Sequence, residues 1–390
     1  MIISRIKLKN WRNFQNVDVE LGNRAFVVGA NASGKSNFLD AVRFLRDIAK
    51  PGGGLETAVR DRGWVSKIRS LAARRESAVE IEVYLSSLAG QEIPDWKYAV
   101  SFNGVSKLEK SQRVSKPKLV FEKVWKNDVL ILNRPNREDS NDPELLTQTH
   151  LQQISLNTKF RDIADFLVSI TYLHLVPQLL RHPTAFSGSG LPDDPYGHDL
   201  LEQIARTPEK TRGRLLKRIE GALKLAVPQL KELTTSKDEM GIPHLEAKYE
   251  HWRPQGAKQR EDQFSDGTLR MIGLLWALLQ ADSVLLLEEP ELSLHASIVD
   301  KLPALIHRLT QNLKRKRQVI LTTHSSDLLS DRGIDGGEVI ILSPDTEGTQ
   351  VKRATSVVEI RHELESGFSV AEVIKPRTEP SNVNQLPLFK

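Results

Sequence analysis

A glycine-rich segment between an apolar strand and a helix constrains this fold more than any other feature. Residues 29–36 read GANASGKS, which fits the pattern G-x-x-x-x-G-K-[ST]. Residues 25–28 form an apolar strand before it, and apolar residues recur at helical spacing after Ser36. Glycines let backbone N–H groups wrap a polyphosphate, and a helix N-terminus adds partial positive charge. This segment predicts a phosphate-binding loop, in which Lys35 reaches the outer phosphates and Ser36 ligates Mg²⁺.

Two further apolar strands end in polar residues that suit phosphate chemistry. Residues 283–295 read SVLLLEEPELSLH, and a strand next to the loop strand would place Glu288 near magnesium and Glu289 near the terminal phosphate. Glu289 is then the candidate base that orients water. His324 ends the strand in QVILTTHSSDLL and is placed to hydrogen-bond a terminal phosphate. The alternatives are two solvated acids at a strand end and a loop histidine.

A fourth motif opens a buried helix. Residues 264–279 read FSDGTLRMIGLLWALL, where Ser265 is a good N-cap and the following helix is apolar nearly all round. A Ser-Asp-Gly turn at a helix start is a second anion-binding end. It cannot serve a nucleotide that the phosphate loop of the same chain already holds, so we expect a site completed by a second subunit.

The remaining chain is organised around these motifs. Residues 78–132 read as strands with a hairpin signal at Asn103-Gly104, and residues 200–233 read as mostly helical. Alternating helix and strand from residue 265 onward indicates a parallel sheet covered by helices. The predicted boundaries give an N-terminal lobe, a helical insertion, a C-terminal lobe and a disordered tail, at residues 1–178, 179–262, 263–374 and 375–390.

Composition excludes several kinds of chemistry. The chain has no cysteine, which rules out disulfides, cysteine-ligated metal and a thiol nucleophile. No apolar run reaches the length of about 18 residues that a membrane span needs, and the N-terminus lacks a signal-peptide pattern. We therefore expect no membrane association and a cytoplasmic location.

In order and spacing, the four motifs resemble the ATP-binding-cassette superfamily, in its RecF- and SMC-like branch. Stand-alone prokaryotic RecF-like and overcoming-lysogenisation-defect-like ATPases are the most similar. Residues 6–45 and the Glu-Glu-Pro-Glu of residues 288–291 carry the resemblance, which covers residues 1 to about 50 and 260–345. It implies an α/β P-loop ATPase head: a mixed sheet with helices, an N-terminal antiparallel β-subdomain and a short helical insertion. Because residues 176–264 hold no sustained heptads, no long coiled coil is expected.

The resemblance also assigns roles by position. The implied nucleotide-binding residues are Gly29, Asn31, Gly34, Lys35, Ser36 and Asn37. Glu288 and Ser36 would hold Mg²⁺, Glu289 would be the catalytic base and His324 the switch histidine. The signature motif, reaching the partner's ATP, would be Ser265, Asp266 and Gly267, while Ser293 and His295 would lie in a loop coupling the two sites.

Some positions have competing interpretations. The family's magnesium-sensing glutamine has Gln178 as its candidate, with Gln152 and Gln153 as alternatives. Arg12 and Asn13 match positions that approach nucleotide in some relatives, and a solvated hairpin explains them equally well.

Positive charge is clustered although the net charge is only +5. Residues 60–76 carry +4, and residues 107–126, 206–224 and 308–317 carry +5 each. Converging clusters would track a DNA backbone, whereas separate ones are solvated faces. Near the C-terminus, Gln385, Leu386, Leu388 and Phe389 resemble the peptide by which bacterial repair proteins dock on the sliding clamp, and a tail packed back on its own domain is the alternative.

The sequence therefore predicts an ATPase that hydrolyses ATP by water attack on the γ-phosphate within an ATP-sandwiched homodimer, in DNA repair, DNA maintenance or phage defence. The second hypothesis is a regulatory ATPase that holds and releases a separate effector such as a nuclease. A transporter subunit is disfavoured by Glu-Glu-Pro-Glu and by the N-terminal strand pattern.

Overall fold

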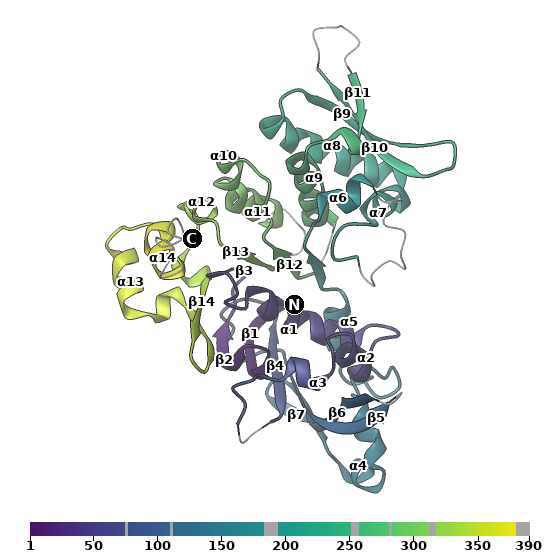
Figure 1. Cartoon of the computed structure of the whole chain (residues 1–390), viewed down its shortest axis with the longest axis vertical. Coiled ribbons are helices and arrows are strands. Elements are labelled where there is room, and N and C mark those ends of the chain that lie inside the picture. The colour runs from purple at the N-terminus through teal and green to yellow at the C-terminus, as the bar shows by residue number, and fades with distance from the viewer. Residues whose placement is uncertain are drawn as a thin grey trace.

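The computed structural model describes residues 1–74, 77–109, 112–182, 194–250, 257–280, 283–311 and 317–379. A central mixed sheet lies between a lobe built on an antiparallel sheet and an arm that projects from the opposite side (Figure 1). The predicted mixed α/β class, with an N-terminal antiparallel β-subdomain, is confirmed. In the described part of the chain the longest helix has 18 residues, so no long coiled coil is present there.

The central sheet gathers strands from both ends of the sequence. Its order is β15-β14-β3-β13-β12-β8, and all neighbours are parallel except β14 and β15. The strands are β3 (Arg24–Gly29), β8 (Thr171–Leu173), β12 (Leu285–Glu288), β13 (Val319–Thr323), β14 (Val339–Asp345) and β15 (Gly348–Arg353). Since Val28 pairs with Thr323 and Glu288 with Thr322, the carboxyl ends of β3, β13 and β12 meet at one edge of the sheet.

The second sheet is antiparallel, in the order β2-β1-β4-β5-β6-β7. Its strands are β1 (Ile2–Trp11), β2 (Phe14–Glu20), β4 (Val79–Ser86), β5 (Trp96–Glu109), β6 (Gln112–Lys126) and β7 (Val129–Arg134). The predicted hairpin at Asn103-Gly104 is wrong, because β5 continues through both residues. A Cβ on Gly104 would lie 1.9 Å from Ser115 Oγ, so glycine there serves a close cross-strand approach rather than a turn.

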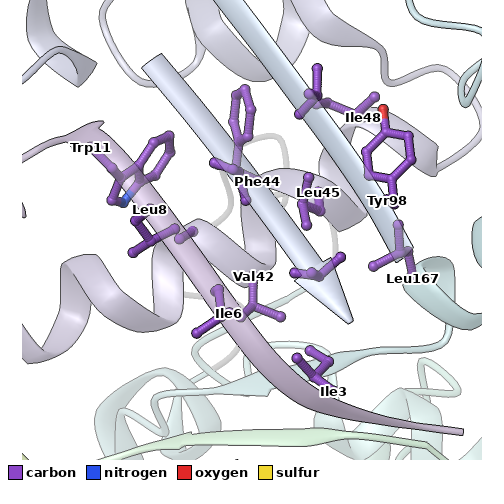
Figure 2. Close-up of a cluster of buried hydrophobic side chains, with 14 of the residues drawn as sticks. Ile3, Ile6, Leu8, Trp11, Val42, Phe44, Leu45, Ile48, Tyr98 and Leu167 are labelled. Atoms are coloured by element: carbon purple, nitrogen blue, oxygen red, sulfur yellow. The ribbon is translucent and has the colours of Figure 1, made fainter. Parts of the chain in front are cut away.

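Helix α1 (Lys35–Ala49) joins the two sheets into one core. Figure 2 shows Val42, Phe44, Leu45 and Ile48 of α1 among apolar side chains of the antiparallel sheet. Burying these side chains contributes about 1.5–3 kcal/mol each. The helix that follows the phosphate loop is therefore held on its whole inner face. Helices in this lobe are α1, α2 (Leu55–Arg60), α3 (Val65–Ile68), α4 (Arg137–Asn141) and α5 (Arg161–Val168).

The arm between the two halves differs in part from the predicted helical insertion. It contains α6 (Pro177–Arg181), α7 (Leu200–Arg206), α8 (Glu209–Ala226) and the antiparallel sheet β9 (Leu230–Lys237), β10 (Pro243–Tyr249) and β11 (Ala257–Arg260). The helical pattern expected to run to residue 233 stops at α8. Leu230, Leu233, Leu245 and Ala247 instead bury the inner side of this small sheet against the arm's own apolar cluster. The arm packs on α9 (Asp266–Gln280), which returns the chain to the central sheet.

The C-terminal region is helical on one side of the sheet. Its helices are α10 (Ala296–Val299), α11 (Leu302–Gln311), α12 (Ser326–Leu329), α13 (Val358–Glu365) and α14 (Val370–Thr378). Because Val373 and Ile374 are buried, α14 extends to Thr378, so the first residues of the predicted tail are helical. The sliding-clamp motif at residues 385–389 lies outside the described residues. Nowhere in the described ranges does a helix combine the length and apolarity that crossing a membrane requires.

Candidate functional site

The phosphate loop closes on its own backbone between β3 and α1. Ala32 and Gly34 have φ angles of 63° and 99°, in the left-handed region that reverses the chain. Gly34 is required sterically, since a Cβ there would lie 2.1 Å from Asn13 Nδ2. Asn13 Nδ2 in turn donates to Ser33 O over 2.9 Å, so residues 12–13 brace the loop from outside. Arg12 lies 3.2 Å from Asp40 at the start of α1.

Lys35 is the buried cation of this loop. Its ammonium donates to Gly29 O over 3.0 Å and to Ala30 O over 3.2 Å, and the residue is 7% exposed. Burial lowers the pKa of Lys35, and the carboxylates of Glu289, Glu291 and Glu288 oppose that shift. The two carbonyl contacts are single hydrogen bonds that an anion bound in the loop would replace with charge-assisted ones.

Glu288 joins the end of β12 to the first turn of α1. Ser36 Oγ donates to Glu288 Oε1, and the Tyr172 hydroxyl on β8 donates to Glu288 Oε2. Burial, together with the Glu288 charge, raises the pKa of Tyr172, which therefore stays a donor. The Arg43 guanidinium stacks 3.9 Å from the centroid of the Tyr172 ring. A hydroxyl and a carboxylate in contact form an oxygen donor set of the kind that Mg²⁺ prefers.

Glu289 points to another neighbour although it follows Glu288 directly. Its φ of 44° turns the backbone at the strand end, and its N–H donates to Thr322 O over 3.1 Å. Glu289 Oε1 lies 3.1 Å from His324 Nδ1. The two adjacent carboxylates therefore separate, one toward Ser36 and one toward His324.

The signature turn at the start of α9 is held by the arm. Ser265 Oγ accepts from Thr268 N over 3.2 Å, as expected of an N-cap. Asp266 accepts from Arg181 Nη2 over 2.5 Å and from Gln178 Nε2 over 3.1 Å. Gly267 lies against the segment after β12, since a Cβ on it would be 2.8 Å from Ser293 O.

Two buried charged residues, Glu291 and Arg270, lie on the segment after β12 and on α9, with no ion pair shown between them. Glu291 is 6% exposed, accepts from Thr323 Oγ1 over 2.5 Å, and leaves Oε2 without a partner in the described structure. Arg270 is also 6% exposed, and its Nε and Nη1 find no acceptor among the described residues. Burial raises the pKa of Glu291 and lowers that of Arg270, with Glu291 the leading opposing charge on Arg270.

The predicted site residues thus fall into three groups. Lys35, Ser36 and Glu288 lie together, as do Glu289 and His324; Ser265, Asp266 and Gly267 lie on the arm side. Asn31 is exposed and, with His324, lines a cavity of about 200 Å³ that reaches α14. Asn37 donates to Asn13 Oδ1 over 2.8 Å and lines a cavity of about 750 Å³ beside the loop.

The three glutamine candidates all contact other parts of the chain. Gln178 contacts Asp266, Gln152 accepts from Leu55 N over 3.0 Å, and Gln153 contacts Gln148. From the segment after β8, the side chain near Glu288 is His174, whose Nδ1 is 4.0 Å from Oε1. Among the coupling-loop candidates, Ser293 has a φ of 61° and His295 caps α10 by accepting from Ser297 N.

Five polar residues of the site were missed by sequence reasoning: Arg43, Tyr172, His174, Arg181 and Arg270. The strand-like run at residues 170–176 was a signal for Tyr172, since a strand beside β12 brings its polar residue to Glu288. Arg270 was hidden inside a helix that is otherwise apolar.

Known proteins are similar to this chain in sequence or in fold. The chain matches the family described as "AAA domain, putative AbiEii toxin, Type IV TA system" over residues 24–331. It is 49% identical to the Endonuclease GajA of Bacillus cereus strain VD045 over 47 residues, which cover 12% of this chain and 8% of that endonuclease. The crystal structure of the SmcHead bound to the C-winged helix domain of ScpA matches with a TM-score of 0.52 and 16% identity, over 90% of this chain and 98% of that one. This last likeness concerns the fold alone.

Proposed function

This chain belongs to the AAA domain family that it matches over residues 24–331. On that premise we propose that it binds ATP and hydrolyses it by water attack on the γ-phosphate. The observation that carries the proposal is the contact between Ser36 and Glu288 beside the phosphate loop. Two segments 252 residues apart meet there at the carboxyl edge of the parallel sheet. Ligands of open α/β sheets bind at this edge.

Nucleotide would bind along the loop and the start of α1. Backbone N–H groups of the loop and the helix N-terminus favour the phosphates, and Lys35 would exchange its two carbonyl partners for phosphate oxygens. The cavity of about 750 Å³ lined by Arg12, Asn13 and Asn37 adjoins the loop and has room for a nucleoside.

The oxygen donors present fit Mg²⁺, which Ser36 and Glu288 would hold. Bound there, the ion would neutralise charge on the phosphate oxygens. Tyr172 would orient Glu288 by its hydrogen bond, and His174 would approach from the same side.

Glu289 and His324 would carry the chemistry of water attack. Glu289 accepts a hydrogen bond from water and aims its oxygen at the γ-phosphorus; the bond to the β–γ bridging oxygen breaks, and the water proton leaves toward the carboxylate or the phosphate. His324, next to Glu289, would donate to the γ-phosphate. Their 3.1 Å separation supports this division of roles.

A second subunit would complete the site. Ser265 and the following N–H groups form an anion-binding helix start on the arm side, apart from the phosphate loop of the same chain (Figure 1). We place this turn over the ATP of a partner, so that two subunits enclose two nucleotides. ATP binding would close the dimer and hydrolysis would open it.

The biological role that we propose is DNA maintenance or phage defence. The 47-residue similarity to an endonuclease favours one alternative in particular, a regulatory ATPase that holds and releases a separate nuclease. Copurification of a second protein from the native host supports that alternative, and DNA-stimulated ATP turnover by the isolated chain supports direct action on DNA.

The direct test measures phosphate release and oligomeric state together. The purified chain with ATP and Mg²⁺ should release phosphate, and light scattering with a non-hydrolysable ATP analogue should show twice the monomer mass. Absence of both nucleotide binding and phosphate release contradicts the proposal.

A further inference from the structure

Helix α8 of the arm has two very different faces. Leu215, Leu216, Ile219 and Leu223 are buried and pack into the arm's apolar cluster, against α9 and β9. These four positions follow helical spacing and cover one side only. The opposite side faces solvent.

The solvent side of α8 carries the cations Lys210, Arg214, Lys217, Arg218 and Lys224, all exposed. Lys224 pairs with Glu220 at 2.7 Å, whereas the other four have no ion-pair partner in the described part of the chain. A helix rises 1.5 Å per residue, so the row is about 21 Å long. By contrast, Arg5 and Lys7 on the antiparallel sheet face carboxylates of Asp18 and Glu82.

Two glycines open the same face to close approach. Positions 213 and 221 follow the spacing of the cations, and a Cβ built on Gly213 or Gly221 would meet no atom within 4 Å. Glycine inside a helix costs about 0.5–1 kcal/mol relative to alanine. A flat, cationic surface with no side chain at two points suits a polyanion whose backbone lies against the helix.

We propose that the exposed face of α8 binds the phosphate backbone of double-stranded DNA. The face has no aromatic side chain between residues 210 and 224 on which unpaired bases could stack, which disfavours single strands. It also lacks the row of bulky apolar residues that an interfacial membrane helix inserts. Duplex DNA carries one negative charge per about 1.7 Å of helix axis. This high linear charge density suits a straight row of cations.

This inference deepens the DNA-linked role proposed above and is independent of the ATP chemistry. Its test therefore omits nucleotide, so that failure here leaves the ATPase proposal standing, and failure of the ATPase leaves this one standing. The contacts are to phosphate, so affinity should not depend on base sequence.

The test measures affinity of the full chain for a fluorescent 30-base-pair duplex by anisotropy, over a series of salt concentrations. A variant with Lys210→Gln, Arg214→Gln, Lys217→Gln and Arg218→Gln removes the unpaired cations. A matched control removes the same charge from ion-paired positions elsewhere: Arg5→Gln, Lys7→Gln, Arg353→Gln and Arg377→Gln. Circular dichroism and thermal unfolding check that both variants fold; none of the eight residues belongs to the proposed ATP site.

The α8 variant should lose at least about tenfold in affinity. The slope of log affinity against log salt should also become shallower by about 3 to 4, because each lost phosphate contact contributes about 0.9 to that slope. The control should stay within about twofold of the parent. Equal losses in both variants, an unchanged α8 variant, no binding of the parent chain, or tighter binding of a single strand of the same length each overturns the proposal.

Discussion

Two buried arginines, one in each half of the molecule, differ in how completely their guanidinium groups are hydrogen-bonded. Arg134 in the antiparallel lobe is 1% exposed and donates to Glu122, Asp139, Leu145 O and Gln148 O. Arg270 on the signature helix is nearly as buried, yet Nε and Nη1 have no acceptor in the described structure. A buried polar group left unpaired costs about 1–3 kcal/mol. The Arg134 guanidinium is thus fully hydrogen-bonded within its lobe, whereas Arg270 keeps unused hydrogen-bonding capacity on the signature side.

The same contrast separates the two ends of the proposed ATP site. Within one chain, Ser36 already contacts Glu288 and Lys35 already donates to the backbone of the phosphate loop. The phosphate side is therefore organised before nucleotide binds. The signature turn has its own cap, and in the proposed dimer it would meet a nucleotide held by the partner. Variants that change only one of the two sides test this distinction.

The largest expected effect lies on the phosphate side. Lys35→Ala removes the buried ammonium that is placed to meet the outer phosphates, so ATP affinity should fall at least about 100-fold. Isothermal titration with ATP and Mg²⁺ measures it, and Lys123→Ala on the antiparallel sheet is the control. Retained affinity in the Lys35 variant would count against the phosphate side as a whole.

Glu289→Gln should separate binding from chemistry. The amide keeps the shape of the side chain but is a poor proton acceptor, so turnover should fall about 10²- to 10³-fold while ATP affinity is kept. Light scattering should then find a long-lived dimer in ATP. Glu363→Gln, at an exposed carboxylate far along the chain, controls for loss of charge; normal turnover in the Glu289 variant means that another group activates the water.

The two arginines provide a direct test of the contrast in stability. Arg134→Met removes the cation that pairs with the buried carboxylates of Glu122 and Asp139, so the free energy of unfolding should fall by about 3–5 kcal/mol. Arg270→Met removes two unpaired donors, and its free energy should stay within about 1 kcal/mol of the parent. Urea titration measures both. A large loss at Arg270 alone would reverse the comparison.

The sequence predicted the phosphate side better than the signature side for a physical reason. GANASGKS and LLLEEP are local patterns in which a strand, a turn and a helix fix the geometry of Lys35, Ser36 and Glu288. Contacts between distant segments leave no such local pattern. Arg181 contacts Asp266 across 85 residues of sequence, and Gln178 also contacts Asp266 instead of approaching Glu288. The small sheet of the arm was missed because β9 buries only Leu230 and Leu233, three residues apart, so it lacks the two-residue alternation of a strand and continues the helical signal before it.

On the signature side, Ser265→Arg should block the turn that a partner's ATP would meet. The large side chain lies at the helix start, so turnover should drop about 30- to 100-fold while the affinity of the monomer for ATP is unchanged. Mixing this variant with Lys35→Ala would rebuild one intact site per mixed dimer and restore roughly a quarter of the parent rate. Full activity of Ser265→Arg alone is the outcome that removes the trans arrangement; Ser330→Arg is the control for bulk.

The smallest effect concerns a residue that acts through another. Tyr172→Phe removes the hydroxyl that donates to Glu288 but keeps the ring under Arg43, so the fold should be unchanged. Removing such an orienting partner weakens metal affinity, here by about 10-fold. The expected signature is a raised Mg²⁺ requirement for ATP turnover, with the rate at saturating Mg²⁺ nearly that of the parent. Tyr84→Phe, at the outer antiparallel sheet, is the matched control. A loss of rate that excess Mg²⁺ cannot recover would place Tyr172 in the chemical step and make the phosphate side less preorganised than its contacts indicate.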